Sequence, residues 1–245
     1  MSTCNACKED TLGFKLEMAF QPIIDIETQS VLAYESLVRG LNQESAFEML
    51  SKVNDSNRYA FDQACRVRAI ELAAQLGLED CLSINFLPNA VYKPENCIRT
   101  TLKTAKENNF AYQKIIFEVT ETEHIHDPQH LKHILKSYKE MGFRTAIDDF
   151  GAGYAGLSLL AEFQPDFVKI DMMLLRGIEN AAPKQAIVRG LTQICRELNI
   201  DVIAEGVETE AEFDWLLGLN LRYFQGYLFS KPGFKVLPKP YYPQP

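Results

Sequence analysis

The stretch Ala146-Ile-Asp-Asp-Phe-Gly-Ala-Gly-Tyr154 is followed, a dozen residues later, by Phe167-Val-Lys-Ile-Asp171. A short apolar strand here ends in two adjacent carboxylates, Asp148 and Asp149, and enters a Gly-x-Gly loop. Because consecutive strand residues point to opposite faces, neighbouring aspartates share a site only where the strand ends and its backbone turns. Parallel α/β folds bind ligands beyond the carboxyl ends of their strands, so the stretch predicts a divalent-cation site there. The alternative is that one aspartate caps the next turn while the other faces solvent.

Apolar, β-branched segments with polar carboxyl ends recur along the chain, and stretches with helical periodicity separate most of them. The strand candidates are 15–24, 31–38, 81–87, 115–120, 144–150, 167–171, 201–207 and 222–230. The helix candidates are 59–76, 95–108, 128–141, 183–198 and 210–217. Because the connection 25–30 is too short for a crossover helix, we expect the first two strands to form an antiparallel hairpin. This order in 245 residues predicts an α/β fold, a (β/α)8 TIM-like barrel with one antiparallel strand.

The chain shows no Gly/Ser-rich linker and no charge block that would divide it. We therefore expect one barrel over 14–236, preceded by a short lead-in over 1–13. Residues 237–245 are too proline-rich for a helix or strand and predict an extended tail. Cys4 and Cys7 form a lone Cys-x-x-Cys pair, which is weak evidence for zinc or redox chemistry without a second pair nearby.

Composition restricts the partners of this chain. The formal net charge is −8 and Lys and Arg do not cluster, so a polymeric nucleic acid is excluded as a ligand. The sequence has neither an apolar run of membrane-spanning length nor a signal peptide. We therefore expect a cytoplasmic protein that does not enter a membrane.

The polar residues at the strand ends offer only oxygen ligands. They are Glu35, Asn85, Glu118, Asp148, Asp149 and Glu205. Oxygen-only sets suit Mg²⁺ or Mn²⁺, and five carboxylates at one barrel mouth repel each other unless about two such cations neutralise them. Two cations of this kind commonly serve phosphodiester hydrolysis. Lys169 would then orient the attacking water or stabilise the charge that develops on the phosphate. Arg39 would bind the phosphate as a clamp. For any single residue, an exposed polar cap at a strand end is the alternative.

The chain resembles the EAL-domain cyclic di-GMP phosphodiesterases, because Tyr34-Glu-Ser-Leu-Val-Arg39 is similar to their Glu-Ala-Leu signature. Further blocks follow in family order: Phe20-Gln-Pro-Ile23, Asn85, Phe117-Glu-Val-Thr-Glu121, Asp148-Asp-Phe-Gly151, Lys169-Ile-Asp171, Ala204-Glu-Gly-Val-Glu208, Gln225-Gly226 and Lys231-Pro232. The resemblance covers 14–232. It implies a barrel with one antiparallel strand that hydrolyses cyclic di-GMP to the linear dinucleotide pGpG with two Mg²⁺ or Mn²⁺ ions.

The resemblance also implies the roles of individual residues. Glu35, Asn85, Glu118 and Asp148 resemble the ligands of one metal, and Asp148, Asp149 and Glu205 those of the second. Lys169, Glu205 and Glu35 take part in the chemical step.

Other matching positions contact the substrate or support a loop. Gln21, Arg39 and Gln225 match residues that contact the substrate or line its site. Glu121 and Glu208 match residues that hold the loop after the aspartate pair.

The departures from the family pattern remove no ligand and no charge. Ser36 replaces an alanine, and the loop after the aspartates reads Gly-Ala-Gly-Tyr-Ala-Gly-Leu. We therefore interpret the chain as an active enzyme that lowers the level of a second messenger. The alternatives are a catalytically silent cyclic di-GMP sensor or protein-interaction barrel, and a Mg²⁺ barrel that abstracts a proton with Lys169.

Two further expectations concern protein partners. Tyr154, Leu157, Leu159, Leu160 and Phe163 place an apolar surface on a short helix, which either packs on its own barrel or joins two subunits. In the resembled family the matching region often contributes to a two-fold dimer, so we expect a homodimer. Because the barrel uses nearly the whole chain, we expect any regulatory input from expression, from the Cys4/Cys7 segment or from a protein in trans.

Overall fold

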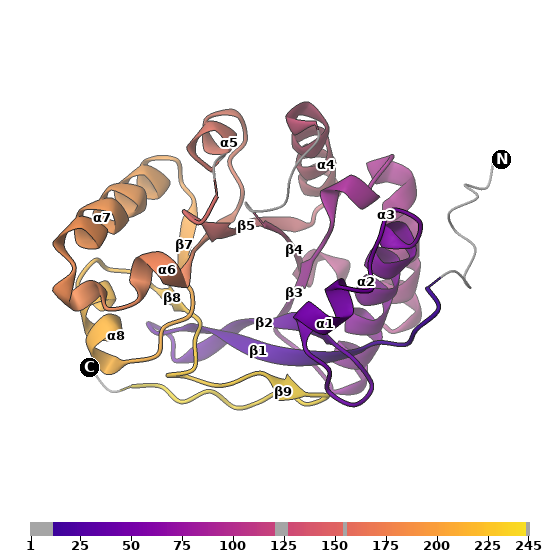
Figure 1. Ribbon diagram of the computed structural model, residues 1–245, viewed down its shortest axis with the longest axis horizontal. Helices are drawn as coiled ribbons and strands as arrows, with labels where there is room; N and C mark the ends of the chain where they lie inside the picture. Colours follow the sequence, from indigo (N-terminus) through magenta and orange to yellow (C-terminus); the bar gives the residue numbers. More distant parts are fainter. Residues whose placement is uncertain (1–11, 121–126, 154–155, 244–245) are drawn as a thin grey trace.

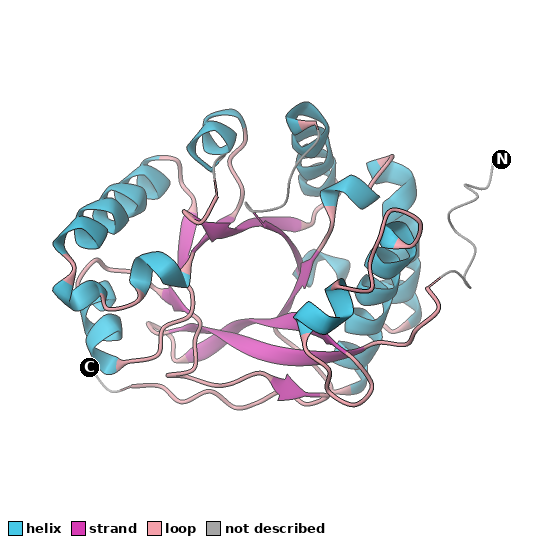
Figure 2. Cartoon of the chain, in the orientation of Figure 1, coloured by secondary structure: helices cyan, strands magenta, loops and turns pink. Residues whose placement is uncertain are grey.

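The computed structural model describes residues 12–120, 127–153 and 156–243. Strands β1 to β8 close into a barrel, and the helices lie outside it (Figure 1, Figure 2). The strands are β1 Glu17–Asp25, β2 Ser30–Arg39, β3 Cys81–Asn85, β4 Ile115–Thr120, β5 Arg144–Phe150, β6 Phe167–Ile170, β7 Asp201–Ala204, β8 Tyr223–Phe224 and β9 Gly233–Phe234. The helices are α1 Ala46–Leu50, α2 Arg58–Gln75, α3 Pro94–Glu107, α4 Pro128–Glu140, α5 Gly156–Glu162, α6 Met172–Leu175, α7 Ala182–Glu197 and α8 Glu210–Leu217. The predicted TIM-like barrel is confirmed.

Strand β1 is the antiparallel member of the barrel. It pairs with β2 through the tight connection that follows Asp25, and it also pairs antiparallel with β8. From β2 to β8, each neighbouring pair of strands is parallel. The predicted N-terminal hairpin is therefore confirmed, and the carboxyl ends of β2 to β8 meet at one mouth.

The last predicted strand, 222–230, is wrong in its extent. Only Tyr223 and Phe224 pair in β8, because the chain then turns at Gly226, whose carbonyl accepts hydrogen bonds from the amides of Phe229 and Ser230. The neighbouring stretch of the β1 edge pairs instead with β9, which the sequence did not predict. Figure 1 shows β9 beside β1, outside the ring.

Two short helices were also missed, and each is fixed by local caps. Helix α1 begins at a capping box in which Ser45 and Glu48 satisfy each other's backbone N–H groups. Helix α6 begins at Asp171, whose side chain accepts a hydrogen bond from the amide of Met173. Helices of four or five residues have too few turns for a periodic pattern, so hydrophobic spacing does not find them.

The barrel is filled by an apolar floor at the end away from the mouth. Its side chains form a cluster separate from the larger core between barrel and helices. The cluster consists of Ile23, Ala33, Ile116, Ala146, Phe167, Ile203 and Tyr223. This floor seals the barrel below the mouth, so ligands reach its interior from the mouth.

The C-terminal segment runs over the barrel without helix or strand up to residue 243, after β9. Tyr34 Oη donates to the carbonyl of Pro238 at 2.9 Å, and the amide of Tyr241 donates to the carbonyl of Phe229 at 2.8 Å. Among the described helices, none is both long and apolar enough to cross a membrane. The domain boundaries and the cytoplasmic location stay predictions, and Cys4 and Cys7 lie outside the described residues.

The turn at Gly226 leads to a stability prediction. A Cβ at this position would overlap the backbone of Val207, which is bonded to Gln225 and Leu228 on either side of the glycine. Gly226→Ala should therefore destabilise the fold by about 1–3 kcal/mol, as overpacking does. Urea denaturation followed by circular dichroism measures this change.

The matched control is Gly190→Ala, because Gly190 is exposed on α7 and its added Cβ would meet no neighbouring atom. That substitution should stabilise the helix by up to about 1 kcal/mol. Equal stability of the two variants would contradict the packing that we describe at Gly226.

Candidate active site

Strand alternation places the candidate site residues one layer above the apolar floor. Glu35 comes two residues after Ala33, and Lys169 two residues after Phe167, so each faces the barrel interior nearer the mouth. The same two-residue step leads from floor residues on other strands to Glu118, Asp148, Glu205 and Gln225. The floor thus supports a polar layer to which nearly every strand contributes.

Lys169 is the centre of this layer and is fully buried. Its Nζ lies 2.8 Å from Asp148 Oδ1, 3.1 Å from Glu118 Oε2, 3.3 Å from Glu35 Oε2 and 3.5 Å from Glu205 Oε2. Glu35, Glu118 and Asp148 are buried as well, and Glu205 is partly exposed. One ammonium group therefore holds carboxylates from four different strand ends together.

Neutral side chains fix the orientation of two of these carboxylates. Asn85 Nδ2 donates to Glu35 Oε1 at 2.8 Å, and Gln225 Nε2 donates to Glu35 Oε2 at 2.7 Å. The hydroxyl of Ser83 donates to Glu118. Sequence reasoning missed Ser83, although it precedes Asn85 by two residues and therefore faces the same interior.

Burial and charge set the ionisation of the cluster. Burial alone would lower the pKa of Lys169, but Asp148 and Glu118 raise it well above its ordinary value. Burial raises the pKa of Glu118 to about 8 against the opposing effect of Lys169, and it also raises the pKa of Glu205. For Asp148, burial is outweighed by Lys169 and by a hydrogen bond from Glu205, so its pKa is lowered. Without cations, protons thus remain on part of the cluster at neutral pH.

Asp149 lies where β5 leaves the barrel. Its φ of 53° is in the left-handed region, which is uncommon for residues other than glycine but tolerated by aspartate. The turn brings Asp149 to the same mouth as Asp148, as the sequence predicted for adjacent aspartates. Burial, together with the charge of Asp148, raises the pKa of Asp149 to about 6.

The donor set fits hard divalent cations. Two groups offer carboxylate oxygens within 4.8 Å of one another: Glu35, Glu118 and Asp148, and Asp148, Asp149 and Glu205. Asn85 Oδ1 and Gln225 Oε1 are buried and find no hydrogen-bond donor among the described residues, so they have free acceptor capacity. These donors are all oxygens, the kind that Mg²⁺ and Mn²⁺ prefer. Five carboxylates and one ammonium group carry a formal charge of −4, which two divalent cations would balance.

Of two further predicted substrate contacts, Gln21 lies beside this cluster and Arg39 lies further along β2. Gln21 pairs with Glu35 in the β1–β2 register, and its Nε2 donates to the carbonyl of Ser230 at 3.0 Å. Arg39 ends β2 at the mouth, where its Nη1 donates to the carbonyl of Val38 at 2.7 Å. The guanidinium is therefore not part of the group that Lys169 holds together.

Of the two residues predicted to support the loop after the aspartate pair, the structure describes only Glu208. Glu208 forms an ion pair with Arg176, with 2.9 Å between its Oε1 and the arginine Nη2. Arg176 was not singled out by sequence reasoning, because no motif connects it with the strand ends. Glu121 lies outside the described residues.

A cavity of about 410 Å³ opens over the carboxylates at the mouth. Asp148, Asp149 and Glu205 line one side of it, and apolar residues such as Leu50 and Phe86 line another. Its size and mixed lining suit a small molecule with both charged and apolar surfaces.

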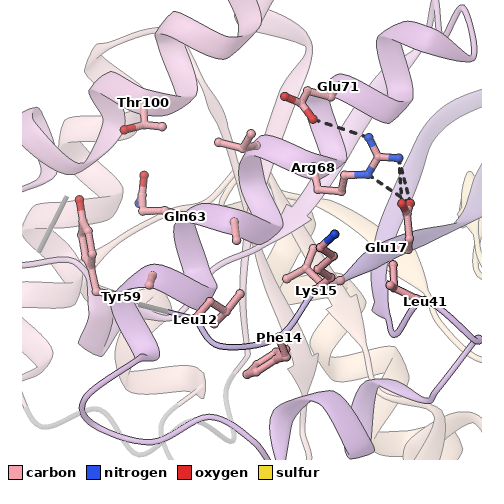
Figure 3. Close-up of a pocket in the computed structure, with 14 residues that line it drawn as sticks. Leu12, Phe14, Lys15, Glu17, Leu41, Tyr59, Gln63, Arg68, Glu71 and Thr100 are labelled. Carbon is pink, nitrogen blue, oxygen red and sulfur yellow. Dashed lines mark hydrogen bonds and ion pairs between the residues drawn. The ribbon is translucent and has the colours of Figure 1, made fainter. Parts of the chain in front are cut away.

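A larger cavity, of about 520 Å³, lies against α2 and away from the carboxylate cluster. Figure 3 shows Arg68 between Glu17 and Glu71 at its edge, held by ion pairs with both. Because Arg68 already pairs with both carboxylates and the rest of the lining is largely apolar, the mouth is the better candidate for an active site.

The fold and the site together define a TIM-like barrel whose carboxylate cluster is able to hold divalent cations. The family model for the EAL domain matches residues 6–232. The chain therefore belongs to the EAL domain family.

Individual proteins agree with this assignment. The crystal structure of a standalone versatile EAL protein from Vibrio cholerae O395, bound to cyclic di-GMP, is 53% identical, covers 94% of this chain and 98% of its own, and superposes with a TM-score of 0.91. The blue light- and temperature-regulated antirepressor BluF of Escherichia coli is 34% identical over 92% of this chain and 56% of its own length. The cyclic di-GMP phosphodiesterase PdeR of Escherichia coli is 36% identical over 56% of this chain and 21% of its own. The chain thus spans about half the length of BluF, and less of PdeR.

The raised pKa of Asp149 predicts a pH-dependent stability. Because its folded-state pKa is about 6, above the ordinary value of 3.8, the ionised carboxylate destabilises the cation-free fold. This penalty is absent below pH 4 and complete above pH 6. Asp149→Asn should therefore raise the melting temperature at pH 8 by about 2–4 °C, the effect of about 1 kcal/mol in a domain of this size. Calorimetry in the presence of a chelator measures the shift.

The gain should shrink towards pH 4, where the carboxyl group is neutral. A gain that is equal at both pH values would mean that the asparagine acts through its tolerance of the left-handed backbone, and not through charge.

Proposed function

We propose that this protein is a metal-dependent phosphodiesterase that hydrolyses cyclic di-GMP to the linear dinucleotide pGpG. The observation that carries the proposal is the complete cluster at the mouth, with five carboxylates and Asn85 around the buried Lys169. The cyclic di-GMP bound to the Vibrio cholerae relative and the name of PdeR support the substrate and the reaction.

Two divalent cations would be held by the two carboxylate groups that share Asp148. When bound, such cations offset the charge of a phosphodiester and acidify a water molecule beside it. The protein supplies the geometry, because Asn85 and Gln225 hold Glu35 in one orientation. In the reaction, a water oxygen bonds to phosphorus, one ester P–O bond breaks, and the departing oxygen takes a proton.

Lys169 provides the fixed positive charge of the site. Its Nζ can hold the attacking water by a hydrogen bond and stabilise negative charge that develops on the phosphate. The floor below it excludes bulk water, which strengthens each of these interactions. Gln21, which pairs with Glu35, and Arg39, at the end of β2, would contact the ester or the guanosine groups of the substrate.

A second candidate is a silent barrel that binds cyclic di-GMP, or a protein, without turnover. The observation in its favour is the similarity to BluF, which is named an antirepressor. The two candidates differ in one measurable result, because a silent barrel binds the dinucleotide and leaves it intact. The Mg²⁺ barrel that enolises a substrate with Lys169 would require that neither binding nor hydrolysis of the dinucleotide occurs.

The proposal predicts the behaviour of two variants towards cyclic di-GMP and Mn²⁺. Asp148→Asn removes the carboxylate that both groups share and should abolish hydrolysis. Lys169→Met should lower kcat by about 10²-fold or more, the usual effect of a lost acid–base or electrostatic group. Chromatography of the nucleotide products measures both rates.

The matched control is Glu27→Gln, an exposed carboxylate that pairs with Arg222 at the opposite end of the barrel. It should keep the wild-type rate. Wild-type protein that binds cyclic di-GMP but never yields pGpG would refute the enzyme and leave the silent sensor.

We also propose that the protein forms a homodimer through the region of α5 and α6. Of the five residues singled out in the sequence, Leu160 and Phe163 are buried and Leu159 is half-buried, so these pack on their own barrel. Tyr154 lies outside the described residues. Leu157 is 57% exposed, and Met173 on α6 is 70% exposed, so an apolar surface remains there.

The dimer proposal predicts that Leu157→Lys lowers the molar mass and makes activity weaker at nanomolar than at micromolar concentration. Because a two-fold contact uses the same patch of both subunits, the substitution places two new charges in one apolar interface. Light scattering measures the mass. Phe47→Lys, on α1 across the barrel mouth, is the control and should leave the mass unchanged (Figure 1). A monomeric wild type with full activity at nanomolar concentration would contradict the proposal.

A further inference from the structure

Arg176, directly after α6, binds three groups of the segment between β7 and the first turns of α8. Its Nη1 donates to both carboxylate oxygens of Glu212, each at 3.0 Å. Its Nη2 donates to the carbonyl of Gly206 at 3.0 Å and lies 2.9 Å from Glu208 Oε1. A planar guanidinium makes such bonds in fixed directions, so it fixes its partners relative to one another.

Glu212, the partner of Arg176 on α8, is itself fixed by burial and by hydrogen bonds. The residue is 2% exposed and also accepts hydrogen bonds from the amides of Gly177 and Glu208, both at 3.0 Å. The amide of Thr209 lies 3.3 Å from the same carboxylate. Arg176 is thus bound to a buried carboxylate that also accepts hydrogen bonds from the chain after α6 and from the chain after β7.

Gly206 connects the contacts of Arg176 with the carboxylate cluster. It follows Glu205, whose own amide donates to the carbonyl of Ile170 at 3.2 Å. Gly206 has φ 70°, and a Cβ there would overlap the side chain of Met172. Gly206, the residue after Glu205, is therefore held between α6 on one face and Arg176 at its carbonyl.

The same short helix contacts the other acidic loop. Leu174 lies against Gly151, where an added Cβ would overlap its side chain. Gly151 comes two residues after Asp149. Lys184 donates to the carbonyls of Met173 and Arg176 at 2.7 and 2.8 Å and so holds α6 in place from α7.

We propose that Arg176 is a positioning residue that fixes Glu205 by holding the carbonyl of Gly206, and thereby completes the carboxylate group of Asp148, Asp149 and Glu205. The inference rests on the proposed function, because it concerns the cation that this group would hold. The group of Glu35, Glu118 and Asp148 is independent of Arg176, since β2 and β4 carry two of its members. Loss of Arg176 should consequently affect one cation site more than the other.

The test compares wild type, Arg176→Met and Arg176→Lys by titration calorimetry with Mn²⁺ alone. Wild type should bind two Mn²⁺ ions per chain. Arg176→Met should weaken one of them by about 10-fold or more, the usual effect of removing a group that orients a ligand. Arg176→Lys keeps the charge but not the planar contact, so its affinity should lie between the other two.

Arg222→Met is the matched control, because Arg222 has an exposure close to that of Arg176, 41% against 37%, and pairs with a buried carboxylate, Asp25, at the other end of the barrel. Both Mn²⁺ affinities should be unchanged in this variant. Equal weakening of both sites in Arg176→Met would indicate general loss of structure and overturn the inference.

Amide hydrogen exchange of the metal-free proteins separates the inference from the proposed function. The segment 205–209 should exchange faster in Arg176→Met than in wild type or Arg222→Met. Unchanged exchange would overturn the inference even if wild type hydrolyses cyclic di-GMP. Faster exchange supports the contact at Gly206, while wild type that binds no Mn²⁺ would refute the proposed function on its own.

Discussion

The electrostatic contacts of Lys169 with its carboxylates are the constraint on which this structure depends. A fully buried ammonium group is costly unless opposite charges surround it, and several carboxylates in one buried layer are costly without a cation. Each therefore stabilises the other. Because the carboxylates come from different strands, the cluster also requires the closed barrel, in which those strand ends meet at one mouth.

The fold and much of the site could be predicted because both follow from strand periodicity. Asp148 and Glu118 stand at the ends of apolar segments, and that pattern is visible in the sequence. It fails for α1, α6 and β9, which are too short to show a period. It fails also for Arg176, whose partners on α8 and after β7 come together only through the tertiary fold. Ser83 is only partly predictable from the sequence, because strand alternation places it on the interior face with Asn85 but no motif singles it out.

The barrel interior has two layers, an apolar floor that contributes stability and a charged layer that forms the candidate active site. The floor around Phe167 and Ile203 is apolar and buried, whereas the layer above it carries more carboxylates than Lys169 can neutralise, and this excess of negative charge opposes folding. Asp149 adds local strain through its left-handed backbone. Strain and like charges persist at the mouth because the surrounding helices and the floor supply the stability, a common arrangement at active sites.

The excess of negative charge at the mouth helps to distinguish an enzyme from a silent barrel. A barrel that only binds a nucleotide or a protein has no need for carboxylates beyond those that pair with Lys169. Here Asp149 remains beyond the four partners of Lys169 and forms a second group of three carboxylates with Asp148 and Glu205. Burial raises the pKa of Glu118 to about 8 and also raises the pKa of Glu205, which favours protons on both. Such a cluster reaches its lowest free energy when cations displace those protons, because binding to the folded state alone stabilises it. The cost that the cluster adds to the cation-free fold is therefore offset when divalent cations bind, which favours the enzyme.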